Sequence, residues 1–125
     1  MLRSVMVVDD SPTIRGFARL LLRTLQVEVV EAADGAQALA AARASPPALV
    51  LADVNMPVMD GLTLTREIRK DAVLGKVPVL LLTGEKTEEL HEQGLAAGAN
   101  EFLGKPLKAP ELQAAVRRWL GEQSP

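Results

Sequence analysis

Carboxylate, hydroxyl and ammonium side chains occur at or just after the ends of four apolar segments of this sequence. They belong to Asp9 and Asp10, Asp53, Thr83, and Lys105. A continuous apolar run of four to six residues is typical of a strand that is buried on both faces. A carboxylate at the end of such a strand is costly unless a nearby group compensates its charge. These five residues therefore form a candidate site if the fold gathers them.

Three carboxylates held close together repel one another. At ~4 Å and an effective dielectric constant of ~20, each pair costs about 4 kcal/mol. A bound cation relieves this repulsion. With no histidine or cysteine near the three aspartates, the donor set favours a hard ion such as Mg²⁺, with Mn²⁺ as the alternative. We therefore expect a divalent-metal site formed by Asp9, Asp10 and Asp53.

The same side chains are suited to phosphoryl transfer. Next to a divalent cation and the ammonium of Lys105, Asp53 is held as the free carboxylate, which is the form that attacks phosphorus. Charge that develops on the phosphoryl oxygens would meet the metal, Lys105 and the hydroxyl of Thr83. Gly84 leaves room for a phosphoryl group to approach the backbone after Thr83. The chemistry indicated is phosphoryl transfer onto Asp53.

Alternating strand and helix signals predict the framework that positions these residues. The expected strands cover residues 5–8, 27–30, 49–52, 77–82 and 101–103, and the expected helices cover 12–25, 35–44, 62–69, 87–97 and 110–120. Five strands that alternate with five helices predict an α/β fold with a parallel sheet covered on both faces. Right-handed crossovers bring the carboxyl ends of all strands to one edge, where ligands bind in such sheets.

The composition limits the function classes. A chain of 125 residues makes one domain, and its lack of cysteine excludes a disulfide framework and a thiolate metal site. A formal net charge of −2 and an aromatic content of 2% argue against nucleic-acid binding. The first residues have no signal-peptide pattern, and no apolar run approaches the length of a membrane span. We therefore expect a cytoplasmic protein with no membrane contact.

Four motifs carry a resemblance that covers essentially the whole chain. They are Val7-Val8-Asp9-Asp10-Ser11, Asp53-Val54-Asn55-Met56-Pro57-Val58-Met59-Asp60-Gly61, Leu82-Thr83-Gly84 and Lys105-Pro106. In these motifs the chain resembles the receiver domains of bacterial two-component response regulators, of the chemotaxis-regulator type. The resemblance implies a flavodoxin-like, doubly wound five-stranded sheet in the order 2-1-3-4-5. It also implies one receiver domain over residues 1–125, with no output domain in this chain.

The resemblance implies a role for each site residue. Asp53 would be the phosphoacceptor, and Asp10 would ligate Mg²⁺ more directly than Asp9. The other implied roles are a backbone carbonyl ligand to the metal from Asn55, phosphoryl binding by Thr83, Gly84 and Lys105, a cis peptide between Lys105 and Pro106, and a switch aromatic at Phe102.

The implied function is that of a signalling switch and not of an enzyme with an external substrate. The phosphodonor would be a sensor histidine kinase or a phosphotransfer protein. The partner protein would bind the face formed by the fourth helix, the fifth strand and the last helix, and the domain would be a monomer or a weak, phosphorylation-dependent dimer. Asn55 and Glu85 match the chemotaxis regulator at positions that flank the phosphoryl path, so we expect them to tune the phosphoryl lifetime and predict a short one.

The sequence also departs from the chemotaxis regulator. Phe102 replaces its usual tyrosine and so lacks a hydroxyl to fix either rotamer. Val54 replaces its tryptophan, and Trp119 lies on the last helix, so intrinsic fluorescence is not expected to report easily on the site.

Other interpretations of the same residues remain open at this point. An aspartyl-phosphate phosphohydrolase would need a carboxylate at Asn55, and a flavodoxin-like electron carrier would need a phosphate loop in place of Asp9-Asp10. A degenerate receiver that only binds proteins is the third alternative. Taken singly, Asp53 could close an Asx turn and Thr83 could cap a helix. His91 is interpreted as a solvated helix residue.

Overall fold

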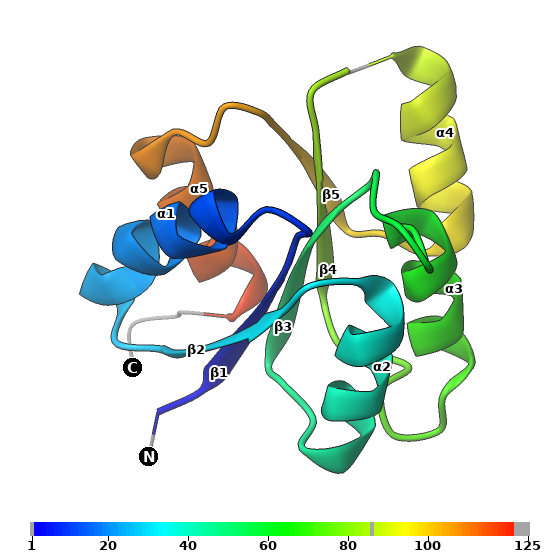
Figure 1. The fold of residues 1–125 in the computed structure, drawn as a ribbon, viewed down its shortest axis with the longest axis horizontal. Coiled ribbons are helices and arrows are strands. Elements are labelled where there is room, and N and C mark those ends of the chain that lie inside the picture. Colours follow the sequence, from blue (N-terminus) through cyan, green and yellow to red (C-terminus); the bar gives the residue numbers. More distant parts are fainter. Residues whose placement is uncertain (1, 86, 122–125) are drawn as a thin grey trace.

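Apolar strands and amphipathic helices alternate along the chain, and together they enclose two hydrophobic cores. The computed structural model describes residues 2–85 and 87–121 (Figure 1). The elements in chain order are β1 (Ser4–Val8), α1 (Pro12–Leu22), the 3₁₀ turn η1 (Arg23–Leu25), β2 (Glu28–Ala32), α2 (Gly35–Ala44), β3 (Leu49–Asp53), α3 (Gly61–Lys70), β4 (Val79–Thr83), α4 (Glu88–Ala97), β5 (Glu101–Gly104) and α5 (Ala109–Trp119).

The five strands form one parallel sheet in the order β2-β1-β3-β4-β5, which confirms the predicted fold. Every residue of the central strands β3 and β4 is buried, as their continuous apolar sequences predict. The register sets Asp53 opposite Leu82 and Thr83 opposite Gly104. The last residues of β3, β4 and β5 therefore meet at one edge of the sheet.

Helices cover both faces of the sheet. In Figure 1, α1 and α5 lie side by side on one face, and α2, α3 and α4 lie on the other. One core joins the first face to α1 and α5 through residues such as Leu22 and Leu112, and the second core joins the opposite face to α2 and α3 through residues such as Leu39 and Leu64. None of the described helices has the length and apolar character needed to cross a membrane.

Helix boundaries follow local signals. Ser11, Asp34, Asp60 and Thr87 each accept a hydrogen bond from the backbone near the start of a helix, and Gly98 ends α4 with a φ of 106°. Because Thr87 caps α4, the alternative assignment of that role to Thr83 is wrong.

Some predicted boundaries are wrong. The first helix ends at Leu22 and continues as the 3₁₀ turn η1, which closes at Gln26 in the left-handed region with a φ of 55°. β2 extends to Ala32, although Glu31 interrupts the apolar pattern, because this edge strand exposes Glu31 to arginines of α1. β4 starts at Val79, after Pro78, which has no amide hydrogen to donate to the sheet.

Candidate functional site

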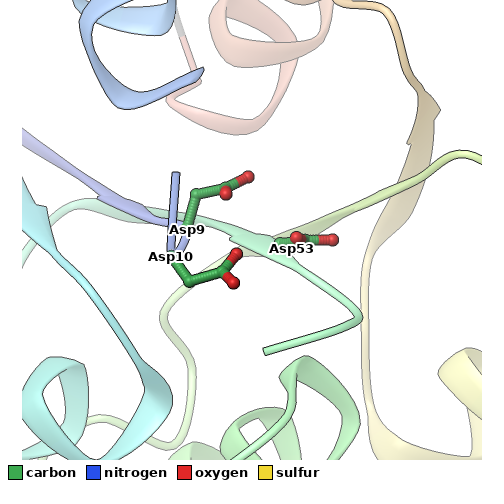
Figure 2. A group of neighbouring side chains, drawn as sticks. All are labelled: Asp9, Asp10 and Asp53. Atoms are coloured by element: carbon green, nitrogen blue, oxygen red, sulfur yellow. The ribbon is translucent and has the colours of Figure 1, made fainter. Parts of the chain in front are cut away.

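Three aspartates form an acidic cluster at the carboxyl ends of β1 and β3. Carboxylate oxygens from Asp9, Asp10 and Asp53 all lie within 4.8 Å of one another. Figure 2 shows the side chains of Asp9 and Asp10 directed towards the side on which Asp53 lies. The exposed fraction is 0% for Asp9 and 6% for Asp53, whereas Asp10 is exposed. The fold thus gathers three carboxylates from distant parts of the sequence.

Lys105 follows β5 and bridges two of these carboxylates. Its Nζ lies 3.1 Å from Asp9 Oδ2 and 3.0 Å from Asp53 Oδ2, and 24% of its side chain is exposed. Burial opposes the charge on this ammonium, but the hydrogen bonds with Asp53 and Asp9 outweigh that effect and raise the pKa of Lys105. The ammonium is therefore firmly charged at neutral pH and offsets part of the repulsion in the cluster.

Asp9 experiences opposing influences. Burial raises the pKa of its carboxyl group, and the hydrogen bonds from the Ser11 amide and from Lys105 offset only part of that increase. The nearby charge of Asp53 acts in the same direction as burial. A buried carboxylate of this kind gains from an additional cation.

The other oxygen of each buried aspartate accepts a backbone hydrogen bond. Asp9 Oδ1 accepts from the Ser11 amide at 2.9 Å, and Asp53 Oδ1 accepts from the Asn55 amide at 3.2 Å. The Asx-turn interpretation of Asp53 is therefore correct, and it coexists with the cluster. Each carboxylate is oriented by the local backbone on one side and by Lys105 on the other.

Gly61, at the start of α3, is required beside Asp53. A Cβ at this position would overlap the main-chain oxygen of Asp53, and the Gly61 amide donates to the Val54 carbonyl at 3.0 Å. The close approach explains the glycine in the Asp60-Gly61 pair. It packs the first turn of α3 against the strand end that carries Asp53.

Thr83 closes the site on the side of β4. It is buried, and its hydroxyl both donates to the Glu85 carbonyl and accepts from the Glu85 amide, each at 3.0 Å. Gly84 is exposed and faces open space. A cavity of about 340 Å³ lies beside Thr83, Gly84 and Lys105. This space leads from solvent to the residues proposed to bind a phosphoryl group.

A second cavity, of about 300 Å³, connects Thr83 with Phe102. The ring of Phe102 is half-buried, packs against His91 at a centroid distance of 5.4 Å, and occupies the place of a side chain at Gly94. His91 is exposed, as expected, but its contact with Phe102 was not predicted. A glycine in the middle of a helix is the signal that could have indicated a side chain packed against α4.

The peptide bond between Lys105 and Pro106 is cis, as the resemblance implied. Trp119 lies on α5, and its indole nitrogen donates to Glu101 at 2.6 Å, one residue before Phe102. Trp119 therefore contacts the strand that carries Phe102.

Two further features, one at Arg15 and one at Val58, were not predicted. Arg15 donates to the main-chain carbonyl of Asp9 at 2.6 Å. Val58, in the loop after Asp53, has a φ of 68°, which is unusual for a β-branched residue. A cation one turn into the helix after Asp9-Asp10 was a usable signal for Arg15, and the sequence held none for Val58.

Comparison with known proteins identifies the family. The family model of the response regulator receiver domain matches residues 5–117. The chain belongs to the response regulator receiver family. Members of this family are signalling phosphoacceptors, and they occur in response regulators and in histidine kinases.

Relatives of both kinds resemble this receiver domain. It is 37% identical over 112 residues to the sensor histidine kinase TmoS of Ectopseudomonas mendocina, which covers 90% of this chain and 11% of that kinase. Other curated relatives are DNA-binding or transcriptional regulators, and the chain spans about half of their length.

Two solved structures are similar along almost their whole length. The chemotaxis protein CheY4 of Vibrio cholerae has a TM-score of 0.90 and 36% identity, with 94% of this chain and 98% of that chain covered. The receiver domain of the sensor histidine kinase PA1611 of Pseudomonas aeruginosa PAO1 has a TM-score of 0.88 and 36% identity, with 97% and 99% covered. That receiver domain holds a magnesium ion in its active-site cleft. The carboxylates of Asp9, Asp10 and Asp53 are a donor set of the hard-oxygen type that such an ion prefers.

Proposed function

We propose that this receiver domain accepts a phosphoryl group on Asp53 in a Mg²⁺-dependent reaction and thereby switches a binding surface for a partner protein. The observation that carries the proposal is the ammonium of Lys105, which forms ion pairs with both Asp9 and Asp53 at the carboxyl ends of the strands. The donor would be a phosphohistidine on a sensor kinase or a phosphotransfer protein.

In the proposed reaction, a carboxylate oxygen of Asp53 attacks the phosphorus atom. The new oxygen–phosphorus bond forms as the phosphorus–nitrogen bond of the donor breaks. The electron pair of the broken bond returns to the imidazole nitrogen. Lys105 and the hydroxyl of Thr83 would bind the phosphoryl oxygens. Mg²⁺, held by Asp9, Asp10, Asp53 and the backbone carbonyl of Asn55, would supply further neutralisation of charge on those oxygens. Water would later hydrolyse the acyl phosphate, at a rate that Asn55 and Glu85 tune.

The switch would begin at Thr83. To donate to a phosphoryl oxygen, its hydroxyl must give up the hydrogen bond that it donates to the Glu85 carbonyl. Thr83 also lines the same cavity as Phe102. We propose that this movement alters the face formed by α4, β5 and α5, where a downstream protein would bind. The domain would carry out only its own phosphorylation and dephosphorylation, in the cytoplasm, as a monomer or a weak phosphorylation-dependent dimer.

The mass of the intact protein after incubation with acetyl phosphate and Mg²⁺ tests this proposal. One added phosphoryl group is expected in the wild type, and none in Asp53→Asn or after removal of Mg²⁺ with EDTA. The decay of the added mass measures the lifetime, and persistence for many hours with Mg²⁺ present would contradict the short lifetime that we predict. Addition of the phosphoryl group to Asp53→Asn would contradict the assignment of the acceptor. No added mass, together with no conformational response to beryllofluoride, would favour a degenerate receiver that only binds proteins.

A further inference from the structure

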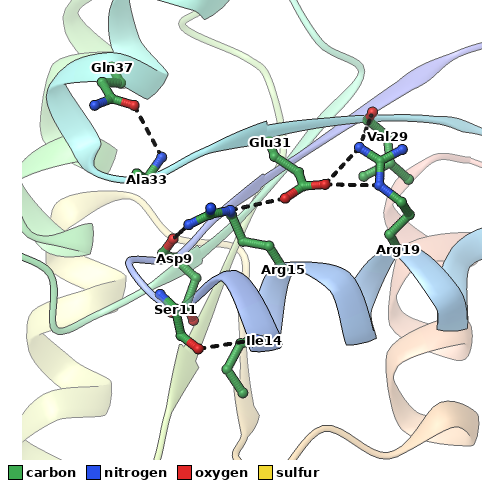
Figure 3. A network of polar contacts seen from close by, with 9 residues as sticks. All are labelled: Asp9, Ser11, Ile14, Arg15, Arg19, Val29, Glu31, Ala33 and Gln37. Carbon is green, nitrogen blue, oxygen red and sulfur yellow. Dashed lines mark hydrogen bonds and ion pairs between the residues drawn. The ribbon is translucent and has the colours of Figure 1, made fainter.

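Arg15 connects the acidic cluster to β2, an outer strand of the sheet. Its Nη1 donates to the main-chain carbonyl of Asp9 at 2.6 Å, and its Nε donates to Glu31 Oε1 at 3.0 Å (Figure 3). Only 17% of its side chain is exposed. The guanidinium therefore joins the end of β1 to β2 through two of its nitrogen atoms.

The carbonyl that Arg15 binds belongs to the peptide group between Asp9 and Asp10. Sheet bonding stops at this point, after the Asp9 amide donates to the Ala32 carbonyl at 3.1 Å. Because the peptide group is planar, a fixed carbonyl also fixes the direction in which the chain continues to Asp10. The contact with Arg15 thus sets the relative orientation of two residues of the cluster.

Arg15 is itself held in place. Glu31 accepts hydrogen bonds from both Arg15 and Arg19, with the Arg19 Nε at 2.9 Å, and these bonds from Arg19 and Arg15 lower the pKa of Glu31. Arg19 also donates to the Val29 carbonyl at 3.2 Å (Figure 3). Glu31 is therefore ionised and fixed, and it restricts the guanidinium of Arg15 to one geometry.

We propose that Arg15 is a positioning residue for the metal site and acts through the main-chain carbonyl of Asp9. It touches neither the metal nor the phosphoryl group in this scheme, and the inference rests on the proposed Mg²⁺ site. Removal of a group that orients a metal ligand typically weakens metal affinity about 10- to 100-fold.

Calorimetric titration with Mg²⁺ tests this role in the wild type, Arg15→Ala, Arg15→Lys and Arg19→Ala, with circular dichroism to establish that each variant is folded. Arg15→Ala is expected to raise the Kd for Mg²⁺ by about 10-fold. The Kd of Arg15→Lys should lie between those of the wild type and Arg15→Ala, because an ammonium lacks the planar fork that reaches both Asp9 and Glu31. Arg19→Ala is the comparison variant, since Arg19 bonds Glu31 but not Asp9. Because Arg19 acts on Arg15 only through Glu31, its substitution should raise the Kd for Mg²⁺ clearly less than Arg15→Ala does. Phosphorylation by acetyl phosphate should recover in Arg15→Ala at saturating Mg²⁺, because the chemical groups remain.

Several outcomes would overturn the proposal. If Arg15→Ala and Arg15→Lys are less stable but bind Mg²⁺ as the wild type does, Arg15 only ties α1 to β2. If Arg15→Ala does not fold, an unchanged Kd in Arg15→Lys leads to the same conclusion. An equal loss in Arg19→Ala would attribute the effect to general loosening of α1. A wild type that binds no Mg²⁺ would instead refute the metal site itself, and this inference with it.

Discussion

The ring of Phe102 fills the space that a side chain at position 94 would occupy, and α4 has a glycine there. Phe102 belongs to β5, so the pair joins the fifth strand to the middle of the fourth helix. The ring also lines the cavity that reaches Thr83. The position of α4 and the rotamer of Phe102 are therefore coupled sterically.

A double-mutant cycle on Gly94 and Phe102 tests this coupling. In the wild-type background, Gly94→Ala is expected to destabilise the domain by about 1–3 kcal/mol, because the ring must leave its place. In a Phe102→Ala background the same change should stabilise it by up to about 1 kcal/mol, because alanine favours a helix over glycine. Urea unfolding measures both. The same sign in both backgrounds would contradict the contact.

Burial raises the pKa of the Asp9 carboxyl, so its charged form destabilises the folded state at pH 7. Asp9→Asn removes this charge and is therefore expected to stabilise the domain at pH 7 by on the order of 1 kcal/mol. With the folded pKa above the unfolded value, protonation favours the native state. That contribution is fully present below the unfolded pKa of about 4 and is lost as the pH rises through the folded pKa.

Urea unfolding at pH 7 and at pH 3.5, both without divalent metal, measures this effect. The advantage of Asp9→Asn should shrink at the lower pH, because protonation of the wild-type carboxyl removes the cost of its buried charge. Asp34→Asn serves as the control, since asparagine caps a helix as well as aspartate does. A less stable Asp9→Asn at pH 7 would mean that the ion pair with Lys105 outweighs the cost of burial.

Val58→Asn is expected to stabilise the domain by about 1 kcal/mol. Val58 has a φ of 68° and is 82% exposed, so its side chain gains little from burial and strains the backbone. Asparagine tolerates the left-handed region far better than a β-branched residue. Val73→Asn is the matched control, because Val73 is also exposed and its φ is not positive. Equal changes in the melting temperatures of the two variants would contradict the strain at Val58.

Mg²⁺ is expected to stabilise the wild type, and Asp10→Asn should remove most of this effect. A ligand present at 100 times its Kd adds about 2.7 kcal/mol to the stability of the native state. Because Asp10 is exposed, the substitution should change stability without metal by less than about 0.5 kcal/mol. Thermal melts with Mg²⁺ and with EDTA measure both effects. An undiminished response to Mg²⁺ in Asp10→Asn would exclude this carboxylate as a ligand.

The sequence predicted what depends on local pattern. Apolar runs indicated all five strands, and the topology of such a sheet placed Asp9, Asp53, Thr83 and Lys105 at a common edge. Contacts that depend on how elements distant in the sequence align with one another could not be predicted from the sequence. Two examples are the bond from Arg15 to the Asp9 carbonyl and the packing of Phe102 on Gly94. The extension of β2 through Glu31 is a third, because it depends on contacts with α1 that no periodicity in the sequence indicates.

β2 forms one outer edge of the sheet, and the arginine pair of α1 has a consequence there. The Glu28 amide donates to the Arg3 carbonyl and the Ala32 carbonyl accepts from the Asp9 amide, both on the side of β1. The backbone groups of Val29 and Glu31, which alternate with these, therefore point outward. An outward row of this kind is a template on which another polypeptide can add a strand. Arg19 covers the Val29 carbonyl and pairs with Glu31, which places charged side chains over that row. The contacts that hold Arg15 beside the acidic cluster therefore also guard the domain against edge-to-edge aggregation.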